Sequence, residues 1–441
     1  MFIIKKPSLL KSTDFFALFL ILFLIFSFYI LKLIFIPSLF NFYNINFLIF
    51  TFSLNNLSSV FSIITFFIFF IGIFASWEYL IKNISSKLIF SLLIFYFSSL
   101  AAFSAANLIT FYFFFELTSI PVIYFLFLFG KRKRKQKALQ LYLTFTLLGS
   151  ILIFLSLLFM KNSYLEFMPI IIVFLCTAFF IKMPIFPFYL WLPEAHVESP
   201  TIGSIFLAGI ILKLGGFGFL KFVYPLIIIN HLNFVLLPLL FSITIISIIM
   251  SAISAIVVHD LKKIIAYSSI SHMGIIFLNM LVPLQSVTTG NFVAMISHSF
   301  TASTLFLIAG ILYDKTGTRN TLYFSCLSIK MPLLAFFTFF GFLANISFPF
   351  TLGFIGELII FLSIGSYSKI LACFIFILSL LITLFSLKFL KIFYFGNLNI
   401  WSKFKIKDIS RKNFWLLLML LIPQLFFGLF PATLLHILSF I

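Results

Sequence analysis

Apolar runs of about 20 residues recur from one end of this chain to the other, and they constrain its fold more than any other feature. A helix needs a run of about that length to cross the roughly 30 Å hydrocarbon core of a bilayer. With 63% hydrophobic and 9% charged residues among 441, the chain is not a soluble globular protein. The alternating pattern of barrel strands is absent, so we expect an all-α polytopic membrane protein.

The apolar runs predict about thirteen transmembrane helices. They are expected at 15–36, 57–80, 88–105, 107–129, 138–160, 167–190, 199–225, 232–258, 262–283, 289–313, 331–363, 366–394 and 412–435. The segment 39–54 contains several asparagines and is expected to be extended or interfacial.

Basic residues cluster in short loops, which explains the net charge of +19 without nucleic acid as a partner. The clusters lie at 131–137, 262–263 and 403–412. Counting crossings places the first two on one side, which is expected to be the matrix or cytoplasm. The segment 194–198 is expected to be a loop on that side. Binding of anionic lipids such as cardiolipin is compatible with these loops.

The chain offers no pattern for a metal or cofactor. Cys176, Cys326 and Cys373 lie far apart, without C-x-x-C spacing, and are expected to be buried apolar residues. A glycine-rich phosphate loop and a Ser-His-Asp set are also absent from the sequence. We therefore expect no cofactor and no metal in this chain.

Two glutamates and two lysines lie inside the apolar runs, namely Glu116, Lys182, Lys213 and Glu357. An ionisable group at the centre of a membrane helix costs roughly 2.5–3.5 kcal/mol on translocon scales. Such groups persist with a partner, with water or with a function, so these four predict a path for charge through the membrane.

The spacing of Glu116 and Lys182 suggests an ion pair. Burial favours neutral lysine, whereas a nearby carboxylate favours the charged form, so a movable pair would act as a proton switch. A static buried pair that fixes helix register is an equal alternative.

Four other residues extend this chain of polar groups. Lys213 lies in a glycine-rich apolar run as a relay site or, alternatively, as a snorkelling side chain. Glu357 is a candidate terminal carrier or a helix-end cap. His272 and His298 lie on consecutive helices among serines and threonines, as relay groups or satisfied core residues.

Prolines interrupt two of the long runs, at 181–187 and 345–353. Each interruption lies within ten residues of a buried charge, and in lipid the freed backbone groups need protein or water partners. Paired interruptions in the two halves of a transporter point to inverted repeats and a site at the midplane. A packing kink is the alternative at either position.

The beginning of the chain shows no cleavage site before its first long apolar run, so we expect no removable leader. Its 71 phenylalanines, with many isoleucine, asparagine and lysine residues, fit an AT-rich genome such as that of an organelle.

Several strings between residues 107 and 365 together carry a family resemblance. They are FFFELTSIP, IKMPIFPFYLWLPEAHVESPTIGSIFLAGIILKLGG, DLKKIIAYSSISHMG, SHSFTASTLFLIAGILYDKTGTRN and GFIGEL. This region resembles the antiporter-like membrane subunits of proton-pumping NADH:ubiquinone oxidoreductase, respiratory complex I, and among them subunit 4. Ser299, where the family usually has glycine, and one helix fewer before 88–105 depart from the pattern.

The resemblance implies roles for the singled-out residues and a division of the chain. Glu116 and Lys182 match the family's coupling pair, Lys213 its central lysine and Glu357 its terminal carboxylate, with His272 and His298 between them. The family fold, two inverted five-helix repeats with two proline-broken helices, implies N-terminal helices at 1–87, repeats at 88–225 and 226–394, and a C-terminal helix at 395–441.

By the same resemblance, the chain would be a proton-translocating core subunit in the mitochondrial inner membrane. NADH oxidation and ubiquinone reduction, with FMN and iron–sulfur clusters, would occur in partner subunits. Antiporter-like subunits 2 and 5 would be neighbours, together with accessory subunits. The alternatives are a subunit of a multisubunit cation/proton antiporter and a scaffold that pumps nothing.

Overall fold

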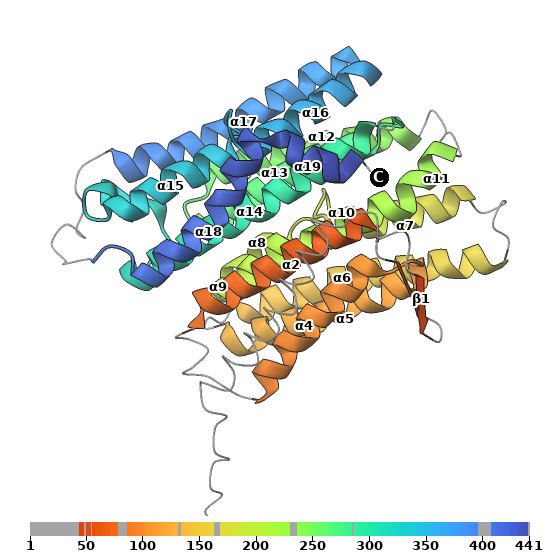
Figure 1. Ribbon diagram of the computed structural model, residues 1–441, viewed down its shortest axis with the longest axis horizontal. Coiled ribbons are helices and arrows are strands. Elements are labelled where there is room, and N and C mark those ends of the chain that lie inside the picture. Colours follow the sequence, from red (N-terminus) through yellow and green to blue (C-terminus); the bar gives the residue numbers. More distant parts are fainter. Residues whose placement is uncertain are drawn as a thin grey trace, which may run out of the picture.

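The computed structural model describes residues 44–47, 50–53, 55–77, 86–130, 134–162, 168–229, 236–284, 286–395 and 407–439. Its helices run side by side, with those of residues 86–162 at one edge of the bundle and those of 352–394 at the other, while those of 56–75 and 411–439 lie between them (Figure 1). In this part of the chain nine helices are long and apolar enough to cross a bilayer. The membrane class is therefore confirmed, while the predicted crossing at 15–36 lies outside the described residues.

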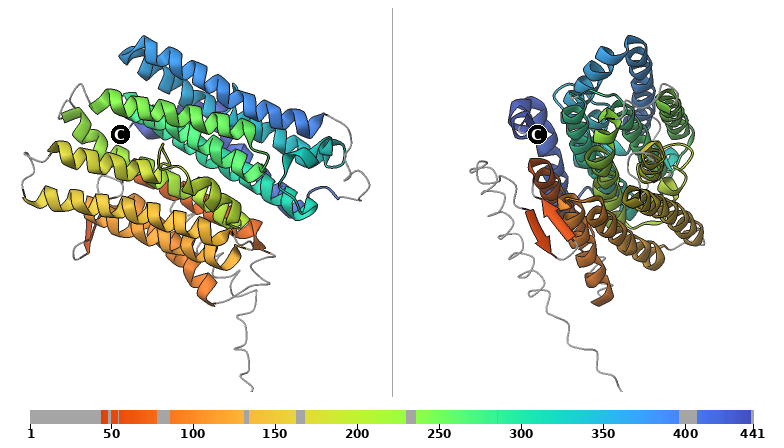
Figure 2. Two further views of the ribbon diagram at one scale, coloured as in Figure 1. Left: turned by 180° about the vertical axis from the view of Figure 1, so that it is seen from behind. Right: turned by 90° about the vertical axis from the view of Figure 1, so that its right-hand side faces the viewer.

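The first half begins with a β-hairpin and continues with long helices. Strands β1 (Asn44–Phe47) and β2 (Phe50–Ser53) pair antiparallel, which confirms the extended conformation expected within 39–54 for these eight residues, while the others of that segment lie outside the described part. Four helices follow close to the predicted positions: α2 (Asn56–Ala75), α4 (Ser86–Ser104), α5 (Leu108–Phe129) and α6 (Lys135–Asn162). The hairpin lies beside α2 in the end-on view of Figure 2.

The first proline interruption divides a helix in two, as predicted. Helix α7 (Met168–Lys182) ends at the interruption, and α8 (Trp191–Glu198) resumes after it. Residues 194–198 do not form the predicted loop. These residues are helical, and His196 and Glu198 are buried because α8 packs against α6 and α13.

The next span is one long helix with two π-helical segments. It comprises α9 (Thr201–Phe206), η2 (Leu207–Ile211), α10 (Leu212–Gly218), η3 (Phe219–Val223) and α11 (Tyr224–Ile229). Lys213 lies in α10, between the two π-helical segments, and such segments often mark functional sites. Periodicity in the sequence did not reveal them.

The second half contains the second interrupted helix. Its elements are α12 (Leu236–Val257), α13 (Leu261–Met280), α14 (Ser286–Thr316), the 3₁₀ turns η4 (Thr321–Phe324) and η5 (Leu327–Ile329), α15 (Pro332–Asn345), α16 (Leu352–Tyr367), α17 (Lys369–Tyr394), α18 (Arg411–Leu429) and α19 (Pro431–Ser439). The interruption at 346–351 separates α15 from α16 and confirms the second proline-broken helix.

The end of α14 is tied to the rest of the structure, and one smaller expectation for this half was wrong. Lys315 lies in the last turn of α14 and donates to the carbonyls of Lys407 and Asp408, and Arg319 donates to the carbonyl of Val197. This segment is therefore part of the packed structure. Cys176 and Cys326 are buried as expected, but Cys373 is exposed because it lies on an outward face of α17.

The centre of the bundle is formed by the Thr201–Ile228 span and by α14, each of which contains an apolar stretch of 18 residues that is buried throughout. Helices α4, α6, α12, α17 and α18 leave large apolar side chains exposed around them. The 20-residue helix α13 is the polar exception, since it carries two lysines, a histidine and an asparagine and still buries most of its residues. Polar residues are thus concentrated at the centre of the molecule.

One end of the bundle, here called the basic end, gathers most of the loop charges. Lys262 donates to the Ser199 carbonyl and Lys263 pairs with Glu194, so the loops before α9 and α13 meet there. The bridge between Asp260 and Asn320 adds the α14–η4 connection. At the other end, here called the opposite end, lie the α13–α14 and α16–α17 connections. This arrangement agrees with the side assignment from crossing counts, although residues 131–133 and 396–406 lie outside the described part.

Candidate functional site

Glu116 of α5 and Lys182 at the end of α7 form the predicted ion pair. Their Oε1 and Nζ atoms are 3.7 Å apart, and the side chains are 24% and 3% exposed, respectively. The ammonium group of Lys182 also lies 4.3 Å from the centre of the Phe115 ring. The lysine is therefore almost fully enclosed, while the carboxylate remains accessible from one side.

The backbone freed by the first interruption is satisfied by distant side chains. The indole Nε1 of Trp191 donates to the carbonyl of Ile181 over 3.0 Å. The Phe186 amide donates to the Ser247 hydroxyl of α12 over 3.1 Å. These contacts fix the end of α7, and with it the position of Lys182.

Lys213 is buried and points into the bundle. It is 1% exposed, and its Nζ donates to the Ala208 carbonyl over 2.5 Å and lies 2.7 Å from Nδ1 of His298. This geometry excludes the snorkelling alternative. Helix α10 also packs closely on α7, because a Cβ at Gly215 would lie 3.4 Å from the Cβ of Lys182.

His272 and Glu357 form a second titratable pair. Nδ1 of His272 on α13 lies 3.5 Å from Oε1 of Glu357 on α16. Glu357 is not a helix-end cap, since α16 begins after Thr351 and the carboxylate approaches the histidine instead. The rings of His272 and His298 are 5.7 Å apart between centroids, which connects this pair to Lys213.

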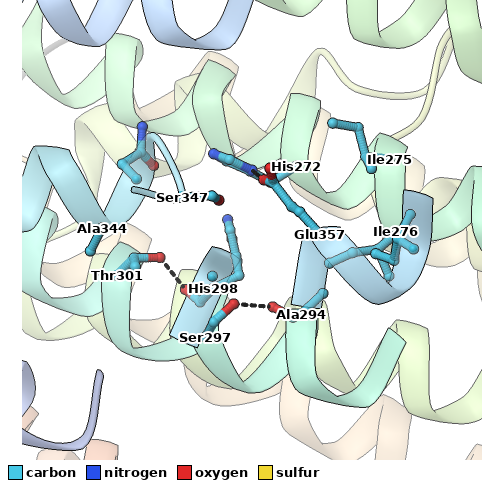
Figure 3. Close-up of a pocket in the computed structure, with 13 residues that line it drawn as sticks. His272, Ile275, Ile276, Ala294, Ser297, His298, Thr301, Ala344, Ser347 and Glu357 are labelled. Carbon is cyan, nitrogen blue, oxygen red and sulfur yellow. Dashed lines mark hydrogen bonds and ion pairs between the residues drawn. The ribbon is translucent and has the colours of Figure 1, made fainter. Parts of the chain in front are cut away.

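A small cavity lies at this second pair (Figure 3). The centre of a water molecule can occupy a volume of about 20 Å³ inside it, so the cavity has room for about one water. Polar groups line it from α13, α14, α16 and the second interruption: His272, Ser297, His298, Thr301, Asn345, Ser347 and Glu357. A bound water there would have several hydrogen-bonding partners.

The structure thus brings the six predicted site residues together as three contacting pairs, here called the polar row, and the close packing of α10 on α7 brings the first pair toward the second. The row begins with the Glu116–Lys182 pair, passes through the Lys213–His298 contact and ends at His272 and Glu357. The contacts among His298, His272 and Glu357 join α14, α13 and α16. The spacing of these residues in the sequence does not show that they meet.

A buried polar group near the basic end was not identified as such from the sequence. His196 is fully buried, its ring stacks on Phe306 at 4.3 Å, and neither ring nitrogen has a hydrogen-bond partner in the structure. Lys262 lies close by, 4% exposed. Its position in the sequence between Lys182 and Lys213 was the signal that could have identified it. In the described part of the chain, no group of three or more His, Cys, Asp or Glu side chains is placed to hold a metal ion.

The sequence is similar to that of known membrane proteins. Residues 105–383 match the family described as "NADH:quinone oxidoreductase/Mrp antiporter, TM". The chain is 37% identical to the NADH-ubiquinone oxidoreductase chain 4 of Chondrus crispus over 83% of this chain and 77% of that protein. It is 33% identical to the NADH-quinone oxidoreductase subunit M of Rickettsia typhi, over 77% and 71%.

A solved structure has the same fold. The chain superimposes on a chain of respiratory complex I from Thermus thermophilus with a TM-score of 0.78 and 25% identity. The match covers 89% of this chain and 85% of that one. Since the family model spans more than half of the sequence, the chain belongs to the NADH:quinone oxidoreductase/Mrp antiporter family of membrane proteins.

Proposed function

We propose that this chain is a proton-translocating core membrane subunit of an NADH:quinone oxidoreductase, of the chain 4 or subunit M type. The observation that carries the proposal is the polar row, in which six titratable side chains contact one another as three pairs. Homology to chain 4 and subunit M proteins supports the same function.

The Glu116–Lys182 pair supplies the switch in this proposal. At an effective dielectric constant of 20, unit charges 4 Å apart attract each other by about 4 kcal/mol. The paired carboxylate therefore stabilises protonated Lys182, and separation by a few ångström favours release of the proton. Lys182, poised at the end of α7, could then pass its proton toward Lys213.

The remaining residues carry the proton onward. The contact between Lys213 and His298 provides a direct acceptor, and the adjacent His272 and Glu357 complete the row. The cavity beside this pair has room for a water that links the side chains. Each step moves a proton between groups, with no electron transferred within the chain.

Electron transfer in this proposal takes place in partner subunits. NADH oxidation with FMN and iron–sulfur clusters, and reduction of ubiquinone, would supply the driving force. Conformational and electrostatic changes in neighbouring subunits would then separate the Glu116–Lys182 pair.

Exposed and partly exposed side chains at membrane depth favour neighbouring subunits that pack against the bundle. Glu116 is 24% and Glu357 18% exposed, and Phe350 in the second interruption is 65% exposed. Irregular backbone at membrane depth requires protein or water around it. We assign these surfaces to antiporter-like subunits 2 and 5, and the basic end to accessory subunits and to anionic lipids such as cardiolipin.

The organisation and location of the chain follow in the same proposal. Residues 88–225 and 226–394 form two inverted repeats, each with one broken helix, between the segments 1–87 and 395–441. The composition favours the mitochondrial inner membrane and an organelle-encoded chain.

Glu116→Ala and Lys182→Ala test the proposal in the whole enzyme in membrane vesicles. Both should reduce proton pumping and coupled quinone reduction, whereas Lys369→Ala, at an exposed lysine that begins α17, should not. Full pumping by both variants in assembled enzyme would refute the role.

The family name itself specifies the main alternative, a cation/proton antiporter without redox partners. Co-migration of the chain with flavin and iron–sulfur subunits on a native gel would exclude it. Unchanged pumping in a Lys213→Ala enzyme would instead indicate a scaffold.

A further inference from the structure

The three helices that carry His272, His298 and Glu357 carry a second polar cluster nearer the opposite end. The Asn279 amide nitrogen of α13 donates to Oδ1 of Asn291 on α14 over 3.0 Å. The Ser363 hydroxyl of α16 donates to Oδ1 of Asn279 over 2.6 Å. All three side chains are buried, with exposures of 0%, 0% and 3%.

Helix periodicity relates this cluster to the titratable pair. Asn279 follows His272 by seven residues, and Asn291 precedes His298 by seven, so each lies two turns along the same face. At 1.5 Å per residue the displacement is roughly 10 Å along the helix axes. It points the same way on both antiparallel helices, toward the opposite end.

One apolar layer separates the two polar levels. Ile276, Ala294 and Ile360 line the cavity at Glu357, and each lies three residues from a member of the cluster. In Figure 3, Ile276 lies to the right of Glu357 and Ala294 to the right of His298. Helices α14 and α16 are in close contact here, since a Cβ at Gly356 would lie 2.8 Å from the amide nitrogen of Ala294.

Beyond the cluster the polar side chains become progressively more exposed. Ser366, one turn after Ser363, is exposed and donates to the Ser363 carbonyl. Thr288, one turn before Asn291, is half-buried. The amide cluster therefore lies between the apolar layer and the surface at the opposite end.

We propose that Asn279, Asn291 and Ser363 form the latch of a closed exit passage, through which the proton of Glu357 leaves at the opposite end. The inference rests on the proposed function and extends it to the exit side. In the closed state the hydrogen bonds hold three helices together and keep the apolar layer dry, and a dry apolar constriction blocks protons. Breaking the latch lets water enter the layer and connects Glu357 to the surface.

The cluster is suited to such a role because it is only partly satisfied. Nδ2 of Asn291 has no hydrogen-bond partner in the structure. An unpaired buried donor is costly, so the opened state gains a water partner that the closed state lacks. A pump also needs one closed side at any moment, and this arrangement closes the exit side while the cavity leaves room for water next to Glu357.

The buried asparagines could alternatively serve only to clamp the helices together. The latch and the clamp are distinguished by the passive leak of protons through the enzyme. We would measure passive proton conductance, without NADH, of vesicles containing the whole enzyme with Ser363→Ala. Loss of one ordinary hydrogen bond should raise the open population and the leak about fivefold. Ser386→Ala removes a buried hydroxyl on α17 that bonds only to its own helix, and it should leave the leak unchanged.

Two further variants complete the test. Asn279→Ala removes both latch bonds and should leak more than Ser363→Ala, and adding Glu357→Gln to Ser363→Ala should abolish the extra leak. Assembled Ser363→Ala and Asn279→Ala enzymes with wild-type leak, or a leak that survives Glu357→Gln, would overturn the passage. Normal pumping by the Glu116→Ala and Lys182→Ala enzymes would instead overturn the proposed function, so the two failures are distinguishable.

Discussion

The two broken helices of this protein solve the same backbone problem in different surroundings. The interruption between α7 and α8 is enclosed at its α7 end, where Met183 and Ile185 are fully buried, whereas Leu190 at its α8 end is 50% exposed. Side chains of α8 and α12 hydrogen-bond to the backbone of the enclosed part. The interruption between α15 and α16 is open, with Phe348 45% and Phe350 65% exposed. It is held by local contacts, such as the bond from the Thr351 hydroxyl to the Phe348 carbonyl.

This difference matches the chemistry beside each interruption. The enclosed one positions a lysine that is 3% exposed, whose charge depends on the Glu116 partner. The open one borders the cavity with room for water and a carboxylate that is 18% exposed. In the proposed function, the first region would therefore hold a proton by pairing, and the second would exchange it with water.

The largest effect should come from the residue between the two regions. Lys213→Met removes the group that contacts His298, so pumping should fall roughly 10²-fold, the low end for loss of a positioned proton-transfer group. Proton uptake or release during NADH oxidation measures it in the whole enzyme. Lys369→Met serves as the matched lysine control, and comparable pumping by the two variants would remove Lys213 from the path.

The two carboxylates should respond differently to the same substitution. Glu116→Gln leaves the nearly buried Lys182 ammonium without its partner, which destabilises the subunit by as much as about 3 kcal/mol. Glu357→Gln faces a histidine that can remain neutral, so pumping should fall with little loss of stability. Thermal release of the subunit from the complex measures stability, and equal destabilisation by both would contradict the contrast.

The hydrogen bonds at the two interruptions should also contribute differently to the free energy of unfolding. Trp191→Phe deletes the donor to the buried Ile181 carbonyl and leaves that acceptor unsatisfied, at a cost of about 1–3 kcal/mol. The stability of the assembled enzyme and its pumping should both decline, because the same contact fixes the end of α7. Normal stability with normal pumping would show that water replaces the indole.

The smallest effect is expected at the open interruption. Thr351→Val removes a local bond beside exposed backbone, where water can substitute, so the loss should be about 0.5–1.5 kcal/mol. Measured beside Trp191→Phe in the same thermal assay, it ranks the two interruptions directly. A larger loss for Thr351→Val would reverse the comparison.

The fold was predictable to the extent that the bilayer dictates it. Apolar runs located the helices, and prolines at 181–187 and 345–353 located both interruptions, because lipid allows few alternatives for the backbone. The segment 194–198 was misplaced as a loop because its charged and polar residues look solvated in isolation. Its burial comes from contacts with α6 and α13, which local composition does not contain.

The sequence by itself determined that this chain crosses a membrane many times and that Glu116, Lys182, Lys213 and Glu357 lie inside its apolar runs at an energetic cost. Only the tertiary structure decided that Lys213 meets His298, that His272 meets Glu357 and that a cavity and an amide cluster adjoin them. The physical reason is that helix length and polarity are local properties. The rotation of each helix, and hence which side chains meet, is set by packing against neighbours far away in the sequence.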